Sequence, residues 1–271
     1  MSDPIELVGR AIDEEHPDWS ASTRRRFVVR AGAALGSAGL LAAVPTVASA
    51  HNLSRRDSQN STERILTVAS TAEVLATIVN TIGFERGLGG DAVTQRNIKA
   101  AAREELVHYK RLVSLGAKPV TKRIWVPDAV FANRTNLLNT LQVGDQIFVN
   151  AYLIATEAFG RRGMGNFAMV AAQFMGVEAV HRALARQSLG LLGNDRVFMK
   201  EGAVETAPGA PNVGQHGFEN VLDAVGQLQK AGFGFGAQGA TPGAFYEFDE
   251  VSKRTPTDPD LNTFSFDLDA K

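Results

Sequence analysis

Four long stretches of helical sequence occur as two closely joined pairs, and this arrangement constrains the fold more than any other feature. Apolar residues recur at helical spacing, and Gly-rich turns separate the members of each pair. We therefore expect two tight helical hairpins. The predicted helices cover about 62–84, 92–115, 135–159 and 166–192.

The segment between the two hairpins is unusually long. It covers about 116–133, contains Pro119 and Pro127, and has no clear helical stripe. A helix of about 25 residues spans about 37 Å, and the segment can reach up to about 60 Å. A simple up-down-up-down bundle would need only a short loop here. We therefore predict an all-α four-helix bundle with one long crossover.

The chain changes character after Leu192. Residues 196–271 are rich in Gly and Pro and have too few apolar positions for a core of their own. We expect this segment to be an extension packed on the bundle, with a fifth helix over about 218–231. The bundle itself is predicted over 61–195, preceded by a linker over 51–60.

A Glu-x-x-His sequence occurs twice inside the predicted helices, as Glu105-Leu106-Val107-His108 and as Glu178-Ala179-Val180-His181. Residues three apart share a helix face, so each motif presents a carboxylate beside an imidazole. Carboxylate oxygens together with imidazole nitrogens suit iron or manganese. With 15 glutamates and 5 histidines in 271 residues, chance predicts about 0.3 copies. Two copies therefore indicate a metal site.

Hairpin geometry identifies a partner for the first motif. Residues equally far from the turn of an antiparallel hairpin lie at equal height. Gly89, inside the Gly-rich turn, is the midpoint in sequence between Glu73 and Glu105, so the two residues should lie at equal height. Glu73 also shares its face with apolar residues, where an isolated charge would be costly. It is therefore the carboxylate expected from the first helix.

The third helix offers two carboxylates, Glu157 and Asp145. Glu157 lies close to Gly160, so it differs in height from Glu178 by about 18 Å. The midpoint of Asp145 and Glu178 falls within the turn. We therefore favour Asp145 and keep Glu157 as the alternative. The predicted metal ligands are Glu73, Glu105, His108, Asp145, Glu178 and His181.

Other polar residues near the motifs receive structural interpretations. Glu104 points about 100° away from Glu105 and is expected to be solvated. Tyr152 is expected to pack in the core, and His216 to be structural. Without a metal, the two Glu-x-x-His pairs would form a buried hydrogen-bonded network, and this alternative stays open.

The first 50 residues have the organisation of an export signal. Thr23-Arg24-Arg25-Arg26-Phe27 precedes an uncharged, Ala- and Gly-rich stretch that ends in Ala48-Ser49-Ala50. This pattern resembles a twin-arginine signal peptide. We expect the twin-arginine export machinery to recognise residues 1–50 and the protein to reach the periplasm, the cell envelope or the extracellular space. An uncleaved signal that anchors the protein in the membrane is the alternative.

The remaining chain excludes several classes of function. Basic and acidic side chains are equal in number beyond residue 50, so nothing attracts nucleic acid. The absence of cysteine excludes disulfides, thiolate metal sites and cysteine nucleophiles. No further segment is expected to span a bilayer, so the mature chain should not be membrane-embedded. A homo-oligomer is left open.

The order of carboxylate, Glu-x-x-His, long crossover, carboxylate and Glu-x-x-His resembles the ferritin-like superfamily, and within it the exported, desiccation-related proteins. Residues 102–108 and 177–181 carry the resemblance, which covers about residues 61–195. It implies a cage for two iron or manganese ions. The matching positions are Glu73, Glu105, His108, Glu178 and His181. Asp145 stands where the family usually has glutamate, and its shorter side chain is expected to alter or weaken that ligand.

Two functions fit this pattern. One is an exported di-iron or di-manganese oxidoreductase, either a ferroxidase or an enzyme acting with peroxide or dioxygen. The resemblance includes manganese catalases, which share the architecture. The alternative is a non-enzymatic stress or desiccation scaffold with a weak or vestigial metal site, which Asp145 and the Gly-rich extension favour modestly.

Overall fold

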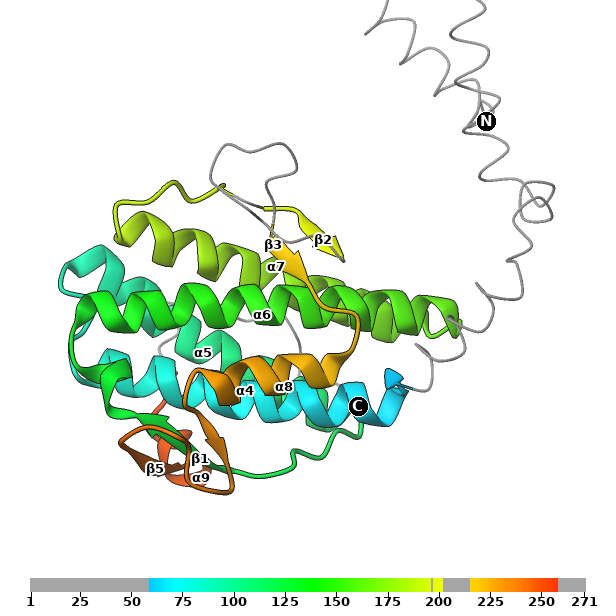
Figure 1. Ribbon diagram of the computed structural model, residues 1–271, viewed down its shortest axis with the longest axis horizontal. Coiled ribbons are helices and arrows are strands. Elements are labelled where there is room, and N and C mark those ends of the chain that lie inside the picture. Colours follow the sequence, from blue (N-terminus) through cyan, green and yellow to red (C-terminus); the bar gives the residue numbers. More distant parts are fainter. Residues whose placement is uncertain (1–58, 196, 202–214, 258–271) are drawn as a thin grey trace, which may run out of the picture. The chain divides into compact units, whose positions relative to one another are not determined.

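Four long helices dominate the computed structural model, which describes residues 59–195, 197–201 and 215–257 (Figure 1). The expected signal peptide and nearly all of the expected linker at 51–60 lie outside the described residues. The long helices are α4 (Thr62–Glu85), α5 (Ala92–Ser114), α6 (Arg134–Arg161) and α7 (Gly165–Ser188). They match the predicted ranges closely, except that α7 ends at Ser188 rather than near Leu192.

Polar side chains determine where three of these helices begin. Ser61 accepts a hydrogen bond from the backbone N–H of Arg64 at the start of α4, and Asn133 caps α6 in the same way. Asp91 accepts from two backbone N–H groups at the start of α5. Such caps satisfy donors that have no partner within the helix. At the α6–α7 turn, Gly163 has a φ of +69°, a conformation that glycine adopts without steric cost.

The crossover between the hairpins runs the length of the helices. Arg134, the first residue of α6, donates to the Gly89 carbonyl at 2.7 Å, so α6 begins beside the α4–α5 turn. At the other end, the Thr62 hydroxyl lies 3.6 Å from the sulfur of Met164, in the α6–α7 turn. Because α5 and α6 therefore start at the same end, the chain must return along the helices between them.

A small β-sheet, which the all-α prediction missed, is built on the crossover. β1 (Arg123–Pro127) pairs antiparallel with both β4 (Gly234–Phe235) and β5 (Gly243–Glu247). The 3-10 helix η1 (Asp128–Phe131) follows β1. A second pair, β2 (Met199–Glu201) and β3 (Gln215–Gly217), is parallel. Because the partners of β1 lie more than 100 residues away, local periodicity could not reveal this sheet.

The extension adds helix α8 (Val221–Lys230) to the bundle, inside the range predicted for a fifth helix. It contacts both α4 and α6 (Figure 1). Its apolar residues Val221, Ala224 and Leu228 are buried in the common core. The short helix α9 (Phe248–Val251) contacts α4 as well.

Helix α4 is the most apolar of the four long helices. Contrary to the expectation from the sequence, its length and composition would allow it to cross a membrane, although 83% of its apolar window is buried inside the protein. Its buried residues include Val74 and Ile78, which are inaccessible to solvent. Because its neighbours cover it almost completely, its hydropathy is that of a central core helix.

Candidate metal centre

All six residues predicted as metal ligands converge at one place inside the bundle. Glu73 comes from α4, Asp145 from α6, and the two Glu-x-x-His motifs from α5 and α7. All six side chains are buried, and those of the three glutamates are fully inaccessible. Because the glutamate and histidine of each motif are three positions apart on one helix, the carboxylate and the imidazole point into the same space.

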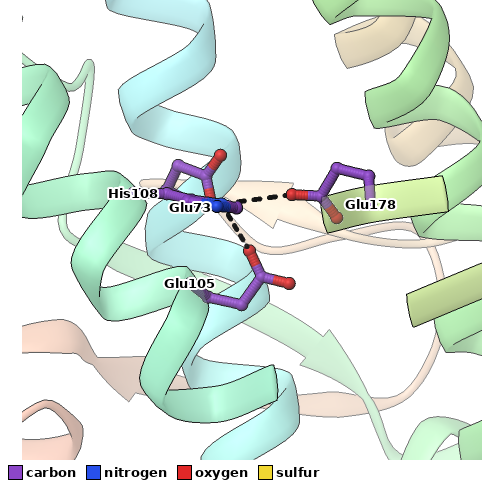
Figure 2. A group of neighbouring side chains, drawn as sticks. All are labelled: Glu73, Glu105, His108 and Glu178. Carbon is purple, nitrogen blue, oxygen red and sulfur yellow. Dashed lines mark ion pairs between the residues drawn. The ribbon is translucent and has the colours of Figure 1, made fainter. Parts of the chain in front are cut away.

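One half of the cluster is centred on His108. Its Nδ1 atom lies 3.6 Å from Glu73 Oε2, 3.4 Å from Glu105 Oε2 and 3.3 Å from Glu178 Oε1. Figure 2 shows these three carboxylates around the imidazole. One ligand atom from each of the four residues lies within 4.8 Å of the others. This half can therefore hold a metal ion.

The other half is centred on His181 and reuses two of the same glutamates. The Nδ1 atom of His181 lies 3.1 Å from Glu105 Oε1 and 3.6 Å from Glu178 Oε2. Asp145 completes this second group of four, again within 4.8 Å. Glu105 and Glu178 thus each present one oxygen to His108 and the other to His181. This is the arrangement of carboxylates that are shared between two neighbouring sites.

The cluster contains many polar atoms that the described part of the protein does not satisfy. Eight oxygen and nitrogen atoms of the six side chains are buried there without a hydrogen-bond partner among the described residues. They include both oxygens of Glu105 and of Glu178 and the Nδ1 atoms of both histidines. Buried polar groups normally have partners, and isolated buried charges are very costly. The donor set therefore fits bound cations.

Burial changes the proton affinity of these groups. It raises the pKa of Glu73 to about 7, although His108 opposes the change. Burial and neighbouring carboxylates also raise the pKa of Asp145 well above its usual range. For His108 and His181, burial favours the neutral ring, but the surrounding carboxylates outweigh it and raise both pKa values well above the usual range. The metal-free cluster therefore holds protons near neutral pH.

Tyr152 supports the cluster from α6. Its hydroxyl donates to Glu73 Oε1, which leaves Oε2 directed at His108. Burial and the charge of Glu73 raise the pKa of Tyr152 well above its usual range, so the phenol keeps its proton. Its ring packs edge-on against Phe174, which in turn stacks on His108. Tyr152 is thus a core residue, as expected, and also orients a candidate ligand.

Glu104 is the functional candidate that the sequence analysis missed. It was expected to be solvated, but its carboxylate accepts a hydrogen bond from Nε2 of His181 at 2.6 Å. Although partial burial opposes it, this hydrogen bond lowers the pKa of Glu104. In the neutral ring that binds a metal, a protonated Nε2 leaves the lone pair of Nδ1 directed into the cluster. The position of Glu104 next to Glu105 could have indicated this contact, because adjacent residues of a helix can contact different neighbouring helices.

We predict that Glu104→Gln weakens metal binding without unfolding the protein. Loss of the charged acceptor leaves the His181 ring less firmly oriented, and such outer contacts typically contribute about 10- to 100-fold in metal affinity. A manganese titration monitored by calorimetry measures the change. Glu85→Gln is the matched control, because it removes a carboxylate that pairs with Arg254 at the surface. Equal affinities in Glu104→Gln and Glu85→Gln would contradict the role of Glu104.

The alternative carboxylate of the third helix lies elsewhere. Glu157 is about half exposed and pairs with Arg161 on its own helix at 3.6 Å. It belongs to neither group of four. The difference in height estimated from the hairpin turn explains this separation. The prediction for His216 concerns a side chain that lies outside the described part of the structure.

Comparison of the chain with models of protein families, with curated proteins and with solved structures finds no match.

Proposed function

We propose that this protein is an exported member of the ferritin-like superfamily and that its buried cluster binds two metal ions, either iron or manganese. The observation that carries the proposal is the pair of four-residue groups that share Glu105 and Glu178. Each group combines three carboxylates with one imidazole, a mixture of ligands that suits both metals. The order of ligands along the chain and the crossover that runs the length of the helices support membership of the superfamily.

Charge supports binding of two ions rather than one. The cluster contains four carboxylates, and two divalent cations would neutralise them while leaving both histidines neutral, as a metal ligand requires. A single divalent cation would leave two negative charges in a buried site. Without metal, protons must supply this compensation, in agreement with the raised pKa values of Glu73 and Asp145.

When bound, iron or manganese in such a site supplies redox chemistry with dioxygen or peroxide. The residues of this chain would hold and orient the ions. Glu104 fixes the ring of His181, Tyr152 fixes Glu73, and Phe174 covers one face of His108. Aromatic and aliphatic core residues, among them Phe174, pack beside the cluster. These features support an oxidoreductase.

A non-enzymatic scaffold is the second candidate, and a specific observation favours it. The cluster can hold protons in place of metal, because the pKa values of two of its carboxylates and both its histidines are raised. A metal-free bundle is therefore chemically reasonable. Under this alternative the four helices would serve only as a stable stress-response framework.

Metal content separates the two candidates. Protein purified without chelators, and protein reconstituted with iron(II) or manganese(II), should contain about two metal ions per chain by mass spectrometry with inductively coupled plasma. Values near zero both after reconstitution with iron(II) and after reconstitution with manganese(II) would overturn the proposal and support the scaffold. Export is tested separately, by replacing Arg24-Arg25 with Lys-Lys and measuring the fraction of protein outside the cytoplasm.

A further inference from the structure

A large cavity lies between α4, α6 and α8, beside the candidate metal centre. Its volume is about 570 Å³, within the range of pockets that hold small organic ligands. Most of its wall is apolar. The largest apolar side chains that line it are Leu75, Leu141, Ile147, Phe148, Leu228 and Phe233.

The inner end of this cavity reaches the metal cluster. Asp145, Asn80 and Leu141 line both the cavity and a second pocket of about 30 Å³, which is also lined by His181. Oδ2 of Asp145 and Oδ1 of Asn80 are buried acceptors without a hydrogen-bond partner in the described part of the chain. A molecule in the cavity would therefore lie directly against a candidate metal ligand.

The charges of the wall do not suit a path for metal ions. Of the described residues that line the cavity, only Asp145, at the inner end, and Lys230 are charged. Five exposed residues mark the mouth: Ala129, Asn139, Val143, Lys230 and Ala231. A lysine at the mouth repels cations and attracts anions. Between Lys230 and Asp145 the described lining offers a cation only neutral amide, hydroxyl and backbone oxygens and no further carboxylate.

We propose that this cavity binds an apolar organic molecule with an anionic end, and that this class of molecule is the substrate of the metal centre. The apolar part would fill the space between α4, α6 and α8, with its inner end beside Asp145 and its anionic end near Lys230. The assignment as substrate rests on the proposed function. It distinguishes an oxidoreductase that acts on organic molecules from one that acts on iron ions.

The helices offer two sites at which the cavity can be filled. A Cβ added to Gly144, which lines the cavity on α6, would meet no atom within 4 Å. Gly144→Leu should therefore direct an apolar side chain into open space, and leucine favours a helix more than glycine does. Ala76→Leu would fill the cavity from α4. Gly160→Leu is the matched control, because Gly160 also lies on α6 and has open space around it but does not line the cavity.

The experiment is calorimetric titration of the metal-loaded protein and its variants with dodecanoate, accompanied by metal analysis of each sample. We expect dodecanoate to bind the wild type and Gly160→Leu equally, and to bind Gly144→Leu and Ala76→Leu at least about 10-fold more weakly. Metal content should stay near two in all four proteins. Lys230→Glu should weaken binding of dodecanoate but not of dodecanol.

The outcomes separate this inference from the proposed function. Failure of the metal-loaded wild type to bind dodecanoate, or equal binding by all four proteins, would overturn the inference and leave the metal site intact. If the wild type holds no metal after reconstitution but still binds dodecanoate, the proposed function and the assignment of a substrate are overturned, whereas the cavity is still shown to bind this class of molecule. If either cavity-filling variant fails to fold, the other provides the same comparison from a different helix.

Discussion

Simultaneous replacement of Glu105 and Glu178 by glutamine is expected to reduce the metal content from about two ions per chain to none. These two residues belong to both groups of four, so their loss removes two carboxylates from each site. An amide offers one weak oxygen ligand and no charge, whereas each of these carboxylates presents its two oxygens to different histidines. Metal analysis after reconstitution with iron(II) and manganese(II) measures the effect.

The same double variant should remain folded without metal. Glutamine matches glutamate in volume, and replacement of buried charges, which the metal-free cluster must compensate with protons, by neutral groups of the same size is often neutral or stabilising. Its melting temperature should therefore equal or exceed that of the metal-free wild type. Glu157→Gln is the control, because it makes the same chemical change on α6 at an exposed position outside both groups. Retention of two metals by the double variant would contradict the proposed site.

Loading of the wild type with manganese is expected to stabilise it strongly. A ligand that binds only the folded state at a concentration 100-fold above its Kd contributes about 2.7 kcal/mol per site. Two sites would therefore raise the melting temperature by roughly 10 to 20 °C in a domain of this size. The measurement is the melting temperature with manganese and after chelation. Manganese should leave the melting temperature of the double glutamine variant unchanged.

The stabilisation should increase with pH, because metal and protons compete for the same groups. Glu73 has a pKa of about 7 in the folded metal-free protein but 4.5 as its ordinary value. Between these pH values the folded state retains a proton that the unfolded chain releases, so the metal-free protein loses stability as pH rises. The raised pKa values of His108 and His181 act in the same direction above pH 6.5. Metal binding displaces these protons and so strengthens with pH.

The difference in melting temperature between the loaded and metal-free proteins should therefore be larger at pH 8 than at pH 6. The loaded and chelated proteins are compared at both values in buffers of equal ionic strength. A difference that is independent of pH would show that the bound metal does not displace protons from Glu73 and the two histidines.

The helices and the cluster could be predicted because both follow from local spacing. The period of apolar residues determines where a helix lies, and the three-residue interval of each Glu-x-x-His motif determines that its two ligands share a face. The height of a residue along a hairpin depends only on its distance from the turn. That relation distinguished Asp145 from Glu157, since Asp145 alone lies in the cluster.

Features that depend on contacts between distant segments required the tertiary structure. The hydrogen bond from His181 to Glu104 joins α7 to α5. The local sequence around Glu104 would be the same if its side chain were solvated, so it could not reveal this contact. The partners of β1 lie in the extension, beyond all four long helices.

The cavity beside Asp145 likewise exists because α8 packs across α4 and α6.

The sequence by itself thus determined the helices, their pairing and the six buried ligand candidates, because these depend on periodicity along one chain segment. Only the tertiary structure decided which outer residues orient the ligands and what space lies beside them. Both depend on how separate segments pack, and no local period encodes that packing.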